Sequence, residues 1–237
     1  MTMRKRFKAP SSRPRIVGVI ASLADVRAAA RLRNPPDLFE IRFDHLFHDL
    51  DKVENQLPIL AARAPLIITA RHPREGGKNN LSLKNRRELL FRFLPSAHYI
   101  DVELRSVRSL RSVLKRARKR KVGCIISFHD FCSTSIVRAL QAKYLAAEKC
   151  GADIFKIATR TDSKSDLVRL FDFFSNNDSK LAISAMGFGK FGRESRRELM
   201  RRGSALNYAG IGRSHVRGQP SLSESRSWAK FPRVRSG

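Results

Sequence analysis

The sequence predicts a single-domain (β/α)8 barrel, an α/β fold of the TIM-barrel type. Eight apolar runs rich in β-branched residues follow one another along the 237-residue chain, at intervals close to the length of one strand-helix unit. Most runs are continuously apolar, as expected for parallel strands covered on both faces, and one barrel domain commonly has about this length. The predicted strands are 16–20, 38–41, 65–70, 99–104, 122–127, 154–158, 181–186 and 208–211.

The segments between the predicted strands carry helical patterns. In 104–115 the apolar side chains follow an i, i+3, i+4 spacing and basic side chains lie between them, which predicts an outer helix with a basic solvent face. Similar patterns predict helices over 23–32, 82–94, 133–149, 163–174 and, shorter and strongly basic, 193–202.

One domain covers 15–222 in this interpretation, because no Pro-rich or Gly-rich linker divides it. We expect a partly disordered basic lead over 1–14 and a basic tail over 223–237. The apolar run 16–21 is too short for a signal-peptide core or a membrane span, so we expect a cytoplasmic protein without membrane association. Three cysteines without CxxC spacing favour free thiols over disulfides or a metal site.

The chain is strongly basic. It has 48 Lys and Arg against 21 Asp and Glu, a formal charge of +27, which predicts a positive field that attracts anionic partners. A nucleic-acid-binding protein is therefore one alternative. The basic runs lack the interleaved aromatic residues of RNA-binding sheets, so we expect nucleic acid to bind only non-specifically.

Lys156 lies inside the apolar run 154–158, an unusual place for an ammonium group. Desolvation disfavours a charged lysine, which can then attack a carbonyl and form a Schiff base. The alternative is a lysine without a catalytic role that extends its ammonium to solvent. His129 follows the preceding predicted strand and offers a general base, unless it is a hydrogen-bonded structural histidine.

Active sites of (β/α)8 barrels form at the carboxyl ends of the strands. Reading each predicted strand end gathers polar groups on one rim, although Arg42 and Arg71 could instead form ion pairs with Glu40 or Glu103. The rim residues are Ser22, Glu40, Arg42, Arg71, Glu75, Asp101, Glu103, His129, Asp130, Lys156, Met186 and 214–219.

An ordered set of motifs resembles the type I 3-dehydroquinate dehydratases over 15–222. No single motif is decisive, but their order along the chain is specific. The motifs are Glu40-x-Arg42-x-Asp44, Thr69-Ala-Arg71 with Glu75-Gly-Gly, Asp101-Val-Glu103, Ser127-Phe-His129-Asp130, Asp153-x-x-Lys156, Ser195-Arg196, Gly203-Ser204 and Gly218-Gln219.

The resemblance implies a hydro-lyase, a carbon-oxygen lyase that converts 3-dehydroquinate to 3-dehydroshikimate and water. Lys156 would form an imine with the C3 ketone, His129 would remove the C2 proton and protonate the departing C1 hydroxyl, and Glu75 would orient the histidine. It implies no metal and no diffusible cofactor. It also implies a homodimer in the shikimate pathway, with quinate breakdown as the open alternative.

Substrate contacts follow from the same resemblance. Arg196 matches the arginine that binds the substrate carboxylate, with Arg193 as the local competitor because the preceding loop 187–194 is slightly longer than the family pattern. His215 stands where the family has a lid serine, which Ser214 could replace, so we expect altered affinity before altered chemistry. The other predicted substrate contacts are Ser22, Glu40, Arg42, Arg71, Met186 and Gln219.

Two further alternatives have weaker support. Residues 187–192 form a GxGxxG pattern that could indicate an NADP-binding enzyme, but no acidic residue lies between Glu198 and Glu224 to bind a ribose. A catalytically impaired homologue is the other alternative. Retention of Lys156, His129 and Glu75 together argues against it.

Overall fold

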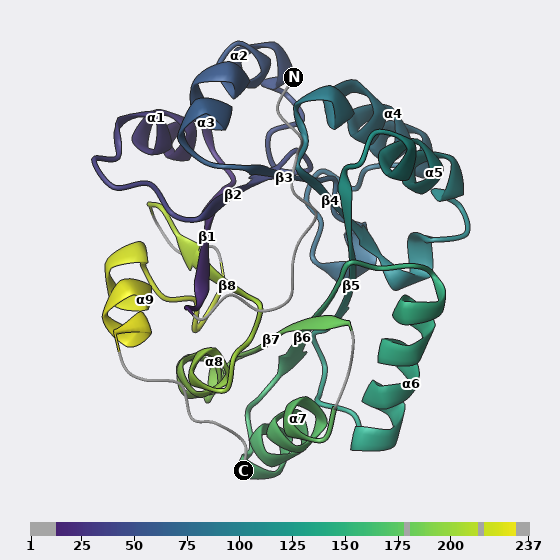
Figure 1. The fold of residues 1–237 in the computed structure, drawn as a ribbon, viewed down its shortest axis with the longest axis vertical. Coiled ribbons are helices and arrows are strands. Elements are labelled where there is room, and N and C mark those ends of the chain that lie inside the picture. The colour runs from purple at the N-terminus through teal and green to yellow at the C-terminus, as the bar shows by residue number, and fades with distance from the viewer. Residues whose placement is uncertain (1–12, 178–180, 213–215, 231–237) are drawn as a thin grey trace.

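The computed structural model describes residues 13–177, 181–212 and 216–230, and it confirms the predicted fold. Eight parallel strands form a barrel, and helices surround it on the outside (Figure 1). The strands are β1 (Arg15–Ile20), β2 (Leu38–Arg42), β3 (Leu66–Thr69), β4 (Tyr99–Glu103), β5 (Gly123–Asp130), β6 (Ile154–Arg160), β7 (Ala182–Phe188) and β8 (Leu206–Gly210).

The strand order is β7-β6-β5-β4-β3-β2-β1-β8, and parallel ladders join each pair of neighbours in it. Between β7 and β8, both within the described part of the chain, no ladder forms. Single hydrogen bonds link them instead: Ala205 N donates to Ile183 O at 2.8 Å, and Ser184 Oγ donates to Leu206 O at 2.7 Å. The barrel therefore closes through a seam that side chains complete.

Side chains alternate between the barrel interior and the layer under the helices. On β6, Ile154 and Ala158 belong to the interior apolar cluster, while Phe155 and Ile157 pack in the outer one. Alternation places Lys156 on the same face as Ile154 and Ala158, so its side chain enters the barrel.

The helices are α1 (Leu23–Arg31), α2 (Leu50–Glu54), α3 (Leu57–Arg63), α4 (Leu83–Phe93), α5 (Arg111–Lys119), α6 (Val137–Lys149), α7 (Lys164–Ser175), α8 (Gly192–Arg201) and α9 (Leu222–Ala229), with the 3-10 turns η1 (Pro73–Glu75), η2 (Leu94–Ser96) and η3 (Leu104–Ser106). Helices α2 and α3 were not predicted from the sequence. The helix predicted from Leu104 begins only at Arg111, because buried Ser106 is hydrogen-bonded to Arg86 at 3.1 Å and η3 ends there.

The predicted basic tail begins with a helix, α9, instead of irregular chain. Ser221 caps it by accepting a hydrogen bond from Glu224 N at 3.2 Å, a serine-to-glutamate spacing typical of helix starts. Leu222 is buried against Ile16 and Ala209, which attaches α9 to the barrel. Residues 1–12 and 231–237 of the predicted lead and tail lie outside the described residues.

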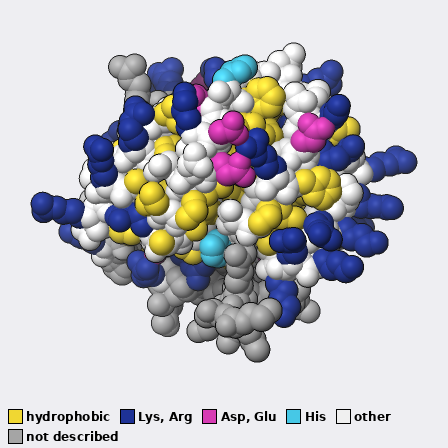
Figure 2. All heavy atoms as spheres, turned by 90° about the horizontal axis from the view of Figure 1, so that it is seen from above, with side chains coloured by type: hydrophobic (Ala, Val, Ile, Leu, Met, Phe, Trp, Pro, Cys, Tyr) yellow, Lys and Arg dark blue, Asp and Glu magenta, His cyan; other side chains and the backbone are white. Residues whose placement is uncertain are grey.

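The surface is rich in cations, most densely on the side where α4 and α5 lie (Figure 2). No Asp or Glu occurs between Glu103 and Asp130. The exposed cations of α5 are Arg111, Lys115, Arg116, Arg118 and Lys119. None of the helices within the described ranges has the length and apolar character that crossing a membrane requires.

Candidate active site

Lys156 lies buried in the barrel mouth with its ammonium held by two carboxylates. Nζ donates to Asp101 Oδ2 at 2.9 Å and to Glu40 Oε1 at 3.2 Å. The same nitrogen lies 3.9 Å from the centre of the Tyr208 ring, a cation-π contact. These contacts stabilise the charged amine, which needs a proton acceptor before it can act as a nucleophile.

Arg71 is the second buried cation of the site. It binds both oxygens of Asp101, at 2.9 and 2.7 Å, and donates to Glu103 at 3.2 Å and to Ser127 Oγ at 2.6 Å. Glu103 in turn pairs with buried Arg86. The resulting network balances three buried carboxylates with three buried cations, which are Glu40, Asp101 and Glu103 with Lys156, Arg71 and Arg86.

Pairing with two cations keeps Asp101 charged. Burial alone would raise the pKa of the Asp101 carboxyl, but the attraction of Arg71 and Lys156 and the hydrogen bonds from Arg71 outweigh it and hold that pKa below its usual range. Asp101 therefore remains a carboxylate at neutral pH. A buried ion network is costly to desolvate, so its presence at a strand-end rim points to function more than to stability.

His129 and Glu75 form a hydrogen-bonded pair on the same rim. Glu75, in η1, accepts hydrogen bonds at 3.0 Å from the backbone N of His129 and has its Oε2 3.0 Å from His129 Nδ1. Its other oxygen lies 3.5 Å from Arg105 Nε. One carboxylate thus fixes both the backbone and the ring of His129.

Electrostatics set the protonation of this pair. Burial, assisted by Arg71 and Lys156, holds the pKa of His129 well below its usual range, so the ring is neutral at pH 7. Burial and the neighbouring carboxylate of Glu103 raise the pKa of Glu75 to about 7. When Glu75 is ionised, Nδ1 carries the proton it donates, and Nε2 presents a lone pair.

Arg196 is a buried cation that pairs with no carboxylate within the described residues. Its Nε donates to Gly187 O at 2.9 Å and its Nη1 to Tyr208 O at 3.3 Å, so it bridges β7 and β8 across the seam. Burial lowers its pKa to about 10, which leaves it charged at pH 7. Arg193, the competing arginine, is exposed and pairs with Glu224 of α9.

The start of α8 positions Arg196. Ser195 Oγ accepts from Gly187 N at 3.0 Å and donates to Gly192 O at 2.8 Å, which fixes the loop to the helix. A side chain at Gly187 would place Cβ within 2.4 Å of both Ser195 Oγ and Thr161 Oγ1. Close packing of the loop therefore accounts for this glycine of the GxGxxG pattern without a dinucleotide.

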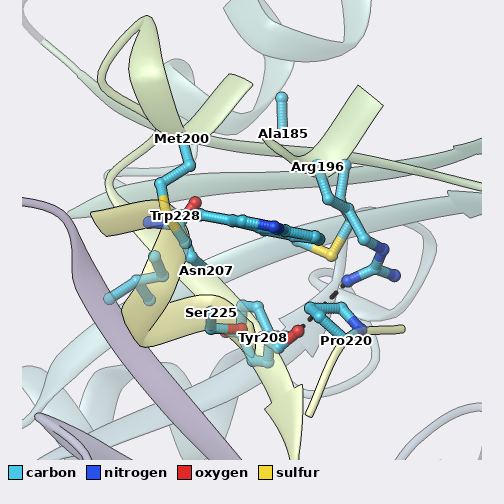
Figure 3. A pocket seen from close by; sticks show the side chains of 10 residues that line it. Ala185, Arg196, Met200, Asn207, Tyr208, Pro220, Ser225 and Trp228 are labelled. Carbon is cyan, nitrogen blue, oxygen red and sulfur yellow. Dashed lines mark hydrogen bonds between the residues drawn. The ribbon is translucent and has the colours of Figure 1, made fainter. Parts of the chain in front are cut away.

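A small cavity lies at the seam among β7, β8, α8 and α9, with the indole of Trp228 reaching across it towards Arg196 (Figure 3). Its volume is about 10 Å³, enough for roughly one water molecule. The hydroxyls of Tyr208 and Ser225, which line it, are buried and find no hydrogen-bond partner within the described ranges.

The family model described as Type I 3-dehydroquinase matches residues 19–233. The chain belongs to the type I 3-dehydroquinase family. This confirms the resemblance found in the sequence, including the part of the chain that forms α9.

Individual relatives of the family cover nearly the whole chain. The chain is 30% identical over 213 residues to the 3-dehydroquinate dehydratase of Thermococcus gammatolerans, an alignment that covers 89% of this chain and 95% of that protein. The crystal structure of 3-dehydroquinate dehydratase from Geobacillus kaustophilus superposes with a TM-score of 0.83 at 26% identity, covering 92% and 91% of the two chains. The type I enzyme from Clostridium difficile, crystallised with covalently modified comenic acid, gives 0.82 at 25% identity, with 93% and 92% covered.

The remaining predicted residues of this family member differ in how free their side chains are. Arg42 pairs with Asp44 at 2.8 and 3.0 Å, not with Glu40 or Glu103. Gln219 has a buried Oε1 with no hydrogen-bond partner in the described part of the chain. Met186 is buried inside the barrel, beside the small seam cavity.

Ser22 and His215 are the remaining predicted substrate contacts. Ser22 caps α1 by accepting from Asp25 N at 3.1 Å, so one lone pair of its hydroxyl is already used. His215 and the neighbouring Ser214 lie outside the described residues.

The roles of Asp101, Ser127 and Tyr208 were not predicted from the sequence. Asp101 and Glu103 share one face of β4, and an acidic pair at i, i+2 in a buried strand was the signal that could have identified them. The inference that desolvation alone discharges Lys156 was incomplete, because Asp101 was not counted as its partner. In the described ranges, no group of three or more His, Cys, Asp or Glu side chains is arranged to hold a metal.

We expect the tautomer of His129 to change with pH near the pKa of Glu75. Above about pH 7 the ionised Glu75 accepts the proton of Nδ1, whereas below it the protonated Glu75 donates to Nδ1 and the ring proton moves to Nε2. Nitrogen-15 NMR of the imidazole measures both states, and in Glu75→Gln the transition should disappear. An imidazolium at pH 6.5, with both nitrogens protonated, would contradict the account.

Proposed function

We propose that this protein is a 3-dehydroquinate dehydratase that forms an imine between Lys156 and its substrate. The observation that carries the proposal is the buried ammonium of Lys156 on the strand next to His129, whose neutral ring is oriented by Glu75. Family membership supports the substrate, and the geometry supports this division of roles.

The first step needs a neutral amine at Lys156. Asp101 is bound by Nη1 and Nη2 of Arg71 and stays ionised. We therefore assign Glu40, whose Oε1 also accepts from Thr69 at 2.9 Å, as the group that takes the proton from Lys156. Nζ then adds to the C3 carbonyl, and loss of water gives a protonated imine. This cation has the same charge, on the same nitrogen, as the ammonium that the network already holds.

The next steps pass one proton through His129. Nε2 removes the C2 proton, and the electron pair flows into the imine to give an enamine. The enamine then expels the C1 hydroxyl, which takes the proton from His129 and leaves as water. Hydrolysis of the remaining imine releases 3-dehydroshikimate and restores Lys156.

Charged and polar side chains on the rim would bind and orient the substrate. Arg196 retains unused N–H groups and lacks a carboxylate partner among the described residues. The substrate carboxylate would accept hydrogen bonds from these groups and form the missing ion pair. Arg42, Arg71, Met186 and Gln219, with Ser22 and His215, form the rest of the proposed binding surface. The protonated imine serves as the electron sink, so the proposed reaction uses neither a metal nor a diffusible cofactor.

The proposed setting is a homodimer in the cytoplasm, acting in aromatic biosynthesis or in quinate breakdown. Free thiols at Cys124, Cys132 and Cys150 are in keeping with a reducing compartment. The exposed cations of α5 support only non-specific contact with nucleic acid, which added salt would weaken.

Borohydride reduction in the presence of 3-dehydroquinate tests the imine. Peptide mass mapping should locate a substrate adduct on Lys156, and Lys156→Ala should lose both adduct and turnover. His129→Ala should keep the adduct while elimination, followed as enone absorbance, slows by about 10²-fold or more. Full activity of Lys156→Ala without any trapped adduct would exclude the mechanism.

The two arginines of α8 provide a matched test of carboxylate binding. Arg196→Gln removes a buried charge-assisted contact, and KM should rise about 10- to 100-fold. Arg193→Gln, on the same helix but exposed and paired with Glu224, should change KM by less than about threefold. Circular dichroism checks that the seam remains closed, and a larger effect for Arg193→Gln would reverse the assignment.

A further inference from the structure

A second cavity lies on the outer side of the His129–Glu75 pair. Its volume is about 260 Å³, whereas about 10–15 Å³ by the same measure holds one water molecule. It opens among η1, η3, β5 and α6, and neither Lys156 nor Arg196 lines it. Of the proposed catalytic and substrate-binding residues, Glu75 and His129 are the two that line this cavity.

Cations dominate the lining of this outer cavity. Arg74 is exposed, Arg105 has 43% of its side chain exposed, and Lys143 is half-buried with Nζ 4.3 Å from the centre of the Phe128 ring. Glu75 is the one carboxylate among the lining residues. Three cations from three different elements therefore face a single carboxylate, and the cavity carries excess positive charge.

The excess charge is not neutralised within the described part of the chain. Arg105 Nε approaches Glu75 Oε1 at 3.5 Å, too far for a strong hydrogen bond, and no ion pair is formed by Arg74 or Lys143 there. Leu104 and Phe128 supply apolar walls. Such a cavity suits a small oxyanion, because charged donors face it from several sides.

We propose that this cavity is a binding site for a small oxyanion, phosphate or carboxylate, that competes with Glu75 for Arg105. The anion would accept hydrogen bonds from Arg74, Arg105 and Lys143. Since Glu75 also holds the ring of His129, occupancy of the cavity is coupled to the orientation of that histidine. An anion that is not the substrate could thus change the orientation of His129 through Glu75.

Two substitutions of opposite sign test the site. Lys143→Gln should weaken binding of inorganic phosphate about fivefold, the size of one partly exposed charge pair. Glu75→Gln should strengthen it by a similar factor, because it removes the repelling carboxylate and releases Arg105. Lys149→Gln, an exposed lysine at the end of α6 outside the cavity, is the matched control and should leave binding unchanged.

The measurement is NMR titration of the full chain with phosphate at low ionic strength, following the backbone amides of His129 and Arg105. It needs no turnover, so its outcome is independent of the proposed reaction. A parallel titration with acetate distinguishes a phosphate site from a carboxylate site. Equal affinities in wild type, Lys143→Gln and Glu75→Gln, or amide shifts confined to the surroundings of Arg196, would overturn the proposal.

Discussion

A closed ion network in the barrel mouth is the constraint on which the site depends. Asp101 binds Lys156 and Arg71 at once, and Glu103 binds Arg71 and Arg86, so every charge of this network has a partner of opposite sign. Removing one member unbalances the buried charges, and Arg86, whose one carboxylate partner in the network is Glu103, would be left unpaired without it, which is far more costly than losing a surface ion pair. The network therefore fixes where the lysine nitrogen lies and gives the cation of an imine an environment that is already organised.

The seam between β7 and β8 connects this network to substrate binding. Arg196 joins the two strands through Gly187 and Tyr208, and Tyr208 in turn places its ring against Lys156. One guanidinium thus has a structural contact on each side and unused donors for an anion. The carbonyls of Gly187 and Tyr208 hold this cation at the seam, where it gives the proposed carboxylate site its donor.

The features that could be predicted were those set by short stretches of sequence. Continuous apolar runs predicted all eight strands, whereas the inward direction of Lys156 became clear only from the two apolar clusters on either face of β6. The unpredicted part depended on partners distant in sequence. Asp101 becomes important only through Arg71 and Lys156, which lie 30 and 55 positions away. Helix α9 was taken for a tail because its basic composition obscured the cap at Ser221 and the apolar contact of Leu222.

The central claim is that the network prepares Lys156 to carry positive charge as an imine, and Asp101 is its most direct test. Rapid-quench single-turnover kinetics with borohydride trapping measure the rate of imine formation in Asp101→Asn, with circular dichroism to confirm the fold. Glu40→Gln, which leaves the Arg71–Asp101 pair intact, is the second variant. The account predicts imine formation slowed about 100-fold in folded Asp101→Asn, with the adduct still on Lys156. Wild-type rates of imine formation in both folded variants would contradict it.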